Sequence, residues 1–180
     1  MIQRMHGTTV IALLHRGQAA IAGDGQVTHT DTIMKTKAVK IRSLANGKIL
    51  AGYAGTAGDA LALFDIFDKK LEETNGHLSR AAIEMVKEWR TEKSLQQLDA
   101  MIAVCDKKTA LMVSGSGDIV EPDDGIVTIG SGGPFALAAA RAFLRANPKL
   151  AAEKVARMSL EVAADICIYT NREITVKGLK

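Results

Sequence analysis

Two pairs of consecutive amphipathic helices alternate with strand-like runs in this chain, and that order restricts the possible folds more than any other feature. Apolar residues recur at three- and four-residue steps through residues 56–73 and 78–93, which predicts the first helix pair. The same spacing returns over residues 134–146 and 151–168. Because each amphipathic helix must bury one face, this order favours sheets packed face to face with helix pairs outside them, and disfavours an alternating parallel sheet.

The strand-like runs between the helices are short and carry turn signals typical of hairpins. Asn46-Gly47, the strongest short-range hairpin signal, separates one pair of runs, and Arg16-Gly17 separates another. We therefore predict an α+β fold, a four-layer αββα sandwich of two antiparallel sheets flanked by helices. Strands are expected over residues 8–14, 18–22, 41–44, 48–53, 99–105, 109–114, 125–129 and 173–176.

Composition narrows the class of protein. A chain of 180 residues with 47% hydrophobic content can bury one core, and no linker-like segment divides it, so a single domain is expected. The formal net charge of +3 comes from interspersed acids and bases, and only 4% of the residues are aromatic. Such a chain offers no stacking platform for bases, so nucleic acid is not expected as a partner.

The sequence also indicates where in the cell the protein is found. Residues 1–6 lack the apolar stretch of a secretory signal, and no apolar segment is long enough to cross a bilayer, so we expect a cytoplasmic protein without a membrane partner.

Cys105 and Cys167 lie far apart in different predicted elements. Neither a zinc site nor a redox pair follows from that spacing, and both are expected to be buried thiols.

The pair Thr8-Thr9 follows Gly7 at the start of the first predicted strand. If the bond between Gly7 and Thr8 is cut, Thr8 gains a free α-amine beside its own hydroxyl, so that one residue holds both a nucleophile and its base. The ordinary pKa of an α-amine, about 7.7–8.0, leaves a useful unprotonated fraction near neutral pH. A threonine pair is also ordinary strand sequence, so the rest of the chain must decide between the two interpretations.

Four segments downstream of Thr8 bear on that decision, and each has an ordinary interpretation when taken alone. A Gly-Asp-Gly sequence is typical of an Asx turn, an isolated lysine is typical of a solvated surface, and Gly-Ser-Gly-Gly before a helix is typical of a helix start or a phosphate nest. The four segments are residues 23–28, 34–42, 51–55 and 129–134.

Together with residues 165–171, these segments resemble in order and spacing the HslV (ClpQ) family of proteasome-related peptidases, in the N-terminal nucleophile hydrolase superfamily. The resemblance runs from Thr8 to about Val176. It implies that residues 1–7 form a propeptide, that residues 8–180 form a single peptidase domain, and that Thr8 is the nucleophile of a threonine peptidase.

The resemblance also implies roles for four further residues. Lys40 matches the family's active-site lysine, whose charge would lower the pKa of the Thr8 α-amine, the group that takes the hydroxyl proton through a water. Asp24 matches the acid paired with that lysine, and it would offset the desolvation of the ammonium group. Gly52 matches the residue whose N–H faces the developing oxyanion. Ser131 matches a serine that lies near the N-terminal amine.

A monovalent cation is part of the same resemblance. Family members bind sodium through backbone carbonyls at the positions that match Ala164, Cys167 and Thr170. Carbonyl oxygens suit such a hard cation. The first position is often glycine in the family and is alanine here, and Cys167 would contribute its carbonyl while its thiol stays uninvolved.

The leader and the assembly follow from the family as well. Many members carry only an initiator methionine before the threonine, whereas seven residues must be removed here, and Gly7 suits self-cleavage because it leaves room at the attacked carbonyl. The resemblance implies a homo-dodecamer of two stacked hexameric rings, fed with unfolded protein substrates by an HslU-type ATPase hexamer. This chain has no Walker-type loop, so ATP would be handled by that partner.

Two alternatives remain open from the sequence. Residues 130–134 at a helix start could form a phosphate nest and make the protein a nucleotide or phosphosugar binder, but that leaves Thr8, Asp24 and Lys40 unexplained. A catalytically silent ring subunit would share the fold. That alternative predicts that one of these three residues is missing, and none is.

Overall fold

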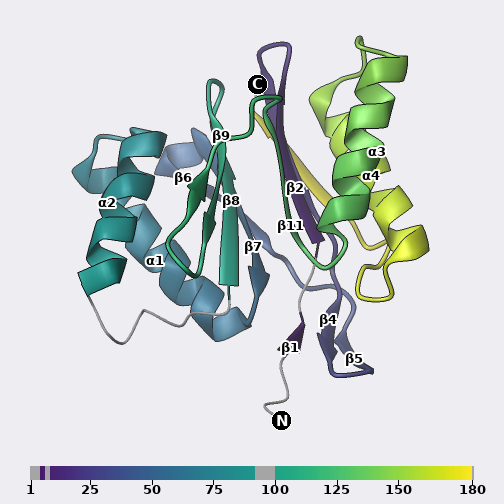
Figure 1. Cartoon of the computed structure of the whole chain (residues 1–180), viewed down its shortest axis with the longest axis horizontal. Coiled ribbons are helices and arrows are strands. Elements are labelled where there is room, and N and C mark those ends of the chain that lie inside the picture. Colours follow the sequence, from purple (N-terminus) through teal and green to yellow (C-terminus); the bar gives the residue numbers. More distant parts are fainter. Residues whose placement is uncertain (1–4, 7–8, 92–99, 180) are drawn as a thin grey trace.

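Two antiparallel sheets pack face to face, and a pair of helices covers the outer face of each (Figure 1). The computed structural model describes residues 5–6, 9–91 and 100–179. The layers are helices, sheet, sheet and helices, which confirms the predicted αββα sandwich.

The first sheet has the strand order β11-β2-β3-β12, so that the hairpin of β2 and β3 forms its centre. A two-residue turn at Arg16 and Gly17, both with positive φ, joins β2 to β3 as predicted. Strand β11 pairs with β2 as far as Gly130 opposite Thr9, which brings the start of the following helix beside Thr9. The four strands are β2 (Thr9–His15), β3 (Gln18–Gly23), β11 (Ile126–Gly130) and β12 (Thr175–Leu179).

The second sheet has the strand order β10-β9-β8-β7-β6. Its β6–β7 connection contains the predicted Asn46-Gly47 turn, in which Ala45, Asn46 and Gly47 all have φ between 50° and 83°. The five strands are β6 (Ile41–Leu44), β7 (Ile49–Gly55), β8 (Ala100–Cys105), β9 (Ala110–Ser114) and β10 (Ile119–Val120).

The four predicted helices are present and lie in two antiparallel pairs outside the sheets. Thr56 caps the first helix by accepting the N–H of Asp59, and Pro134 stands at the start of the third, where a missing N–H costs nothing. In the described part of the chain, no helix has the length and apolar character needed to span a membrane. The helices are α1 (Ala57–Glu73), α2 (Leu78–Thr91), α3 (Gly133–Ala146) and α4 (Ala152–Ile166).

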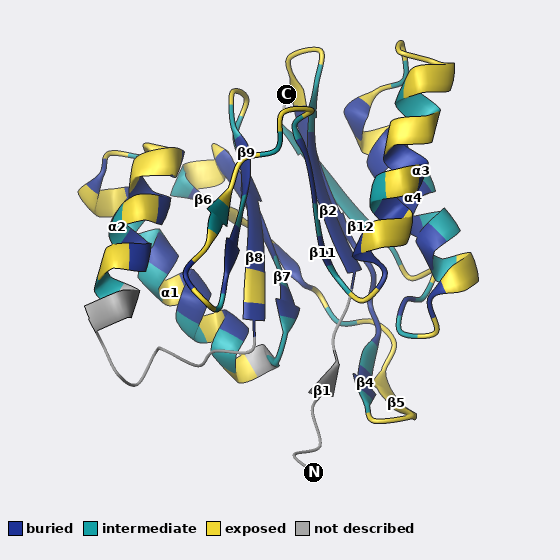
Figure 2. Ribbon diagram, in the orientation of Figure 1, coloured by how far each residue is buried: buried dark blue, intermediate teal, exposed yellow. Residues whose placement is uncertain are grey.

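Buried residues form three apolar layers, visible as the dark inner faces in Figure 2. One layer lies between the sheets, one beneath α1 and α2, and one beneath α3 and α4. Cys105 and Cys167 are buried free thiols, as predicted, and burial raises the pKa of Cys105 to about 12. Because successive strand residues point to opposite faces and both faces are buried, each sheet gives one face to the shared core and the other to a helix pair.

A third, small sheet and two element ends differ from the sequence prediction. Strands β1 (Met5–His6), β4 (Val27–His29) and β5 (Thr32–Lys35) pair in the order β1-β4-β5, and none was predicted, because they are short and β5 is exposed along its whole length. Strand β10, two residues long, was missed for the same reason.

The connection from α4 to β12 also differs. The last helix was expected to reach Ile168 but ends at Ile166, and the last strand was expected from Glu173 but begins at Thr175. The side-chain oxygen of Asn171 accepts the N–H of Glu173 (3.1 Å), which makes an Asx turn where strand was predicted. The chain between α4 and β12 is therefore a structured loop, and it lies at the candidate site.

Candidate active site

Thr9 marks the position of the predicted nucleophile, because Thr8 itself lies outside the described residues. The N–H of Thr9 donates to Oδ1 of Asp24 (2.9 Å), and the N–H of Asp24 donates to the carbonyl of Thr9 (3.2 Å). The second bond continues the β2–β3 ladder by one step beyond the pair Val10 and Gly23, and the first adds the Asp24 side chain to it. Thr9 is fully buried. The residue covalently bonded to Thr8 is thus fixed to the predicted acid by one main-chain hydrogen bond and by one bond to its carboxylate.

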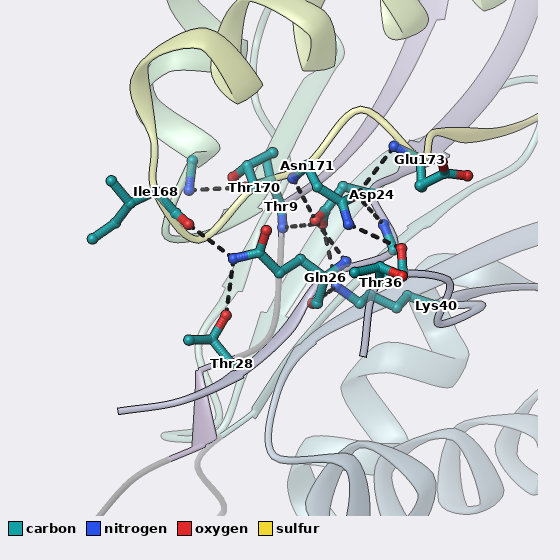
Figure 3. Close-up of polar contacts among 12 residues, drawn as sticks. Thr9, Asp24, Gln26, Thr28, Thr36, Lys40, Ile168, Thr170, Asn171 and Glu173 are labelled. Atoms are coloured by element: carbon teal, nitrogen blue, oxygen red, sulfur yellow. Dashed lines mark hydrogen bonds and ion pairs between the residues drawn. The ribbon is translucent and has the colours of Figure 1, made fainter. Parts of the chain in front are cut away.

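The carboxylate of Asp24 collects donors from four different parts of the chain (Figure 3). Its Oδ1 accepts the N–H of Thr9 and the ammonium group of Lys40, the latter at 3.2 Å. Its Oδ2 accepts the N–H groups of Gln26 (2.9 Å) and Asn171 (3.1 Å). An ionised carboxylate has about four such acceptor positions, so this buried charge is fully satisfied. The bond to Gln26 is also the Asx turn that the Gly-Asp-Gly sequence indicates.

Lys40 is buried in the same cluster, immediately before β6. Its side chain is 1% exposed, which excludes a solvated surface lysine, and its ammonium group contacts Asp24 and the carbonyl oxygen of Gln26. Burial lowers the pKa of Lys40 to about 8, against the opposing effect of the Asp24 charge, which raises it. The structure therefore brings Asp24 and Lys40 together as a buried ion pair beside Thr9.

The hydroxyl of Thr9 faces a second group of residues that sequence reasoning did not assign. It accepts the N–H of Gly132 (2.9 Å) and shares a hydrogen bond with the hydroxyl of Thr170 (2.6 Å). A Cβ on Gly132 would overlap the Thr9 hydroxyl oxygen and lie 2.6 Å from that of Thr170. Position 132 therefore requires glycine, because β2 and the α4–β12 loop both pack closely against it. The sequence of residues 129–134 alone does not show this requirement.

Ser131 lies at the edge of this group. It stands between Gly130, whose register partner is Thr9, and Gly132, whose N–H binds the Thr9 hydroxyl. It is exposed, while Gly132 and Gly133 beside it are buried. The structure thus places Ser131 at the solvent-facing end of the β2–β11 ladder, one residue beyond its last pair.

Gly52 occupies a different kind of position. It lies in the middle of β7 with Ile41 and Ala103 as its register partners on either side. The N–H of Tyr53 donates to the carbonyl of Lys40 on the β6 side (3.2 Å), so the N–H of Gly52 points to β8, because successive amides of a strand point to opposite sides.

The missing side chain of Gly52 is explained by packing between the sheets. A Cβ there would lie 2.8 Å from Val10 Cγ1, 3.0 Å from Ile21 Cδ1 and 3.1 Å from Ile41 Cγ2. This geometry corrects the sequence interpretation of Gly52: its N–H belongs to the sheet ladder, and its lack of a side chain serves the core.

The three predicted cation positions fall at the C-terminal end of α4. Ala164 lies in its last turn, and Cys167 follows the helix, with its N–H donating to Ala163 (2.8 Å) and its carbonyl accepting the N–H of Thr170 (3.0 Å). Carbonyls at the end of a helix lack intrahelical partners and carry the negative end of the helix dipole. Carbonyl oxygens are the ligand type that suits a hard monovalent cation, so the residues present at this turn fit such an ion.

Comparison with known proteins agrees with this arrangement. Residues 5–178 match a protein family described as "Proteasome subunit". The chain is 54% identical over 176 residues to the ATP-dependent protease subunit HslV of Bacillus cytotoxicus, covering 97% of this chain and 98% of that protein.

Solved structures extend the comparison. The crystal structure of HslV from Trypanosoma brucei has a TM-score of 0.89 and 37% identity, over 96% of this chain and 99% of that one. A Thiobacillus denitrificans BPH structure has a TM-score of 0.71 at 21% identity, over 96% and 98% of the two chains, and shares the fold. With a family match over nearly the whole chain and relatives of this similarity, the chain belongs to the HslV family of proteasome subunits.

Proposed function

We propose that this chain is the peptidase subunit of an ATP-dependent, proteasome-like protease, and that it cleaves peptide bonds of unfolded proteins with Thr8, exposed by removal of residues 1–7. One observation carries the proposal. The N–H of Thr9 and the ammonium group of Lys40 meet on the same carboxylate oxygen of Asp24. A buried cation is thereby held close to the residue that is covalently bonded to the nucleophile.

The chemistry follows from those groups. After cleavage before Thr8, its hydroxyl attacks the substrate carbonyl while its α-amine takes the hydroxyl proton. The charge of Lys40 lowers the pKa of that amine and stabilises the oxygen as the proton leaves. Asp24 holds the ammonium group in place and offsets its desolvation. The amine then protonates the leaving group, and water hydrolyses the resulting ester to restore free Thr8.

The oxyanion donor is better assigned to Gly55 than to Gly52. Gly55 ends β7, and its N–H points to the same side as that of Tyr53, because residues two apart in a strand share a direction. Strand β6 begins opposite Gly52, so no β6 residue stands opposite Gly55. Its φ of 116° also favours glycine. A main-chain donor that is free of the ladder is what a developing oxyanion requires.

Ser131 and the cation loop support the same centre. Ser131, exposed beside the end of the β2–β11 ladder, would orient the Thr8 amine once residues 1–7 are removed. A sodium ion held by the carbonyls of Ala164, Cys167 and Thr170 would order the turn from which the Thr170 hydroxyl reaches Thr9. The ion would act structurally, through the shape of this loop.

The assembly belongs to the same proposal. The Bacillus cytotoxicus relative carries the name ATP-dependent protease subunit, which supports an ATPase partner of the HslU type for this chain too. We place the chain in a homo-dodecamer of two stacked hexameric rings in the cytoplasm, with residues 8–180 as one peptidase domain. The competing phosphate nest is disfavoured because the N–H of Gly132 is already bound to Thr9.

The test compares wild type with Thr8→Ala. Intact mass should show loss of residues 1–7 in the wild type only, and hydrolysis of a fluorogenic peptide, with the ATPase added, should be lost in the variant. Retention of peptidase activity by Thr8→Ala would overturn the proposal. If both proteins lose the leader, an external protease does the trimming, and the peptide assay alone decides the role of Thr8.

A further inference from the structure

We propose that Asn171 is a positioning residue for the peptidase reaction, which acts by locking the turn that carries Asp24 to the segment that carries Lys40. This inference rests on the proposed function, because the ion pair it positions serves the Thr8 nucleophile. It concerns a residue from the α4–β12 loop, a part of the chain distant in sequence from both partners. Figure 3 shows Asn171 joined by hydrogen bonds to both Asp24 and Thr36.

The main chain of Asn171 binds Asp24 directly. Its N–H donates to Asp24 Oδ2 at 3.1 Å, on the carboxylate oxygen opposite the one that receives Lys40. Both carboxylate oxygens are thereby held, Oδ1 by Thr9 and Lys40 and Oδ2 by Gln26 and Asn171. The position of residue 171, together with that of residue 26, consequently sets the direction in which Asp24 presents Oδ1.

The side chain of Asn171 bridges two further segments. Its Oδ1 accepts the N–H of Gly25 (3.1 Å), and its Nδ2 donates to the carbonyl of Thr36 (2.9 Å). The carbonyl of Gly25 in turn accepts the N–H of Ala38 (2.9 Å). One amide group therefore closes a ring of hydrogen bonds between the residue after Asp24 and the segment that runs into Lys40.

The fit at this junction is close. A Cβ on Gly25 would overlap the carbonyl oxygen of Thr36, so the two segments touch through their backbones. Only a side chain with both an acceptor and a donor satisfies Gly25 and Thr36 together. Aspartate would keep the acceptor but turn a charged oxygen toward the carbonyl of Thr36, and alanine would provide neither group.

Loss of this bridge should act on the reaction through Lys40. The Asp24 carboxylate is the charged group in contact with the Lys40 ammonium in the described part of the chain, and the processed Thr8 amine would be the other titrating group of the centre. When the segment before Lys40 is released, the ion pair loosens and the cation is less well placed. A misplacement of about 1 Å can cost about 100-fold in rate.

The experiment uses the full chain assembled with its ATPase and compares Asn171→Ala and Asn171→Asp with two matched controls. Thr36→Ala keeps the carbonyl that Asn171 binds, and Arg172→Ala removes an exposed side chain of the same loop whose partner is Asp165. Both Asn171 variants should lose about 10- to 100-fold in kcat with little change in KM, while both controls keep the wild-type values.

The pH profile separates positioning from a merely structural role. Because Asp24 supports the charged form of Lys40, the alkaline limb of kcat should move to lower pH in Asn171→Ala and stay in place in Thr36→Ala. NMR titration of the Lys40 side chain in a Thr8→Ala background provides a readout that does not need activity.

The outcomes are distinct. An Asn171→Ala protein that unfolds at lower temperature but keeps the wild-type kcat, alkaline limb and Lys40 titration would overturn the inference. If Asn171→Ala does not fold, Asn171→Asp is judged by the same three measurements. If wild type lacks Thr8-dependent activity, the proposed function fails, and the Lys40 titration still decides whether Asn171 sets the ion pair.

Discussion

The hydroxyls of Thr9 and Thr170, 161 residues apart in the sequence, share a hydrogen bond of 2.6 Å in the interior of the protein. Thr9 is fully buried and Thr170 is 5% exposed. The same Thr9 oxygen accepts the N–H of Gly132. Three segments, the start of β2, the start of α3 and the loop after α4, are thus joined at one oxygen atom beside the proposed nucleophile.

Replacing Thr9 with valine should therefore destabilise the fold as well as the site. Valine matches the shape of threonine but leaves the N–H of Gly132 and the hydroxyl of Thr170 without their partner. We expect a loss of about 1–3 kcal/mol in the free energy of unfolding, measured by urea denaturation. The same change at the exposed Thr32 should be nearly neutral. A Thr9→Val protein as stable as wild type would show that the shared oxygen contributes nothing to the fold.

Because of Lys40, peptidase activity should fall as pH rises, whereas the free energy of unfolding should increase. Its pKa in the folded protein is about 8, below the ordinary 10.5. Activity should fall as pH rises through about 8, because the cation is lost. Between about 8 and 10.5 the unfolded chain binds this proton more strongly than the folded chain, so the contribution of Lys40 to the free energy of unfolding rises with pH.

Lys40→Met tests both effects. The variant should lose about 10²–10³-fold in kcat, the cost typical of removing one preorganised electrostatic group. Its unfolding free energy, followed from pH 7 to 10.5, should lack the rise expected for wild type. Parallel pH curves for the two proteins would contradict the assignment of that rise to Lys40.

Alanine variants of Gly52 and Gly55 should distinguish a packing role, which affects stability, from oxyanion binding, which affects kcat. Gly52→Ala places a Cβ 2.8 Å from Val10 Cγ1 and should cost about 1–3 kcal/mol in stability, with kcat kept by the folded protein. Gly55→Ala strains a backbone with φ of 116°, moves the N–H of residue 55 and should lower kcat. Peptidase kinetics and thermal unfolding of both variants check this, and a larger kcat loss in Gly52→Ala would restore Gly52 as the oxyanion donor.

Removal of sodium should loosen the loop after α4. Dialysis into choline chloride at constant ionic strength should lower the unfolding temperature and kcat together, because the carbonyls of Ala164, Cys167 and Thr170 would lose the cation proposed to bind them and the Thr170 hydroxyl would be less well held. Re-addition of sodium should restore both, whereas magnesium should not. Identical unfolding curves in sodium and choline would argue against a cation at this turn.

The sequence predicted the elements that are long and periodic, since α1 to α4 and the two hairpin turns each have a local signal. It missed strands of two to four residues, such as β4 and β5, whose pairing depends on neighbours distant in sequence. The early end of α4 was missed because residues 167–168 keep the apolar pattern while the hydrogen bonds change.

The candidate site was predicted unevenly. Asp24 and Lys40 were found through a family resemblance, since no local pattern shows that a lysine is buried. The contacts of Thr9 with Gly132 and Thr170, and those of Asn171, depend on the fold and span more than a hundred residues. The sequence interpretation of Gly52 as the oxyanion donor differs from its packing role in the structure. The sequence cannot distinguish a glycine whose missing side chain makes room for a substrate from one that makes room for the core.

Strand β1 gives the proposed cleavage a second effect. Met5 and His6 pair with His29 and Thr28, so the leader completes one edge of the small β1-β4-β5 sheet. Cutting before Thr8 would remove that strand and leave β4–β5 as a two-stranded hairpin with unpaired amides along β4, a surface that readily accepts another extended chain. Maturation would then create a reactive terminus and, in the same step, an open sheet edge on the segment that leads from Asp24 to Lys40.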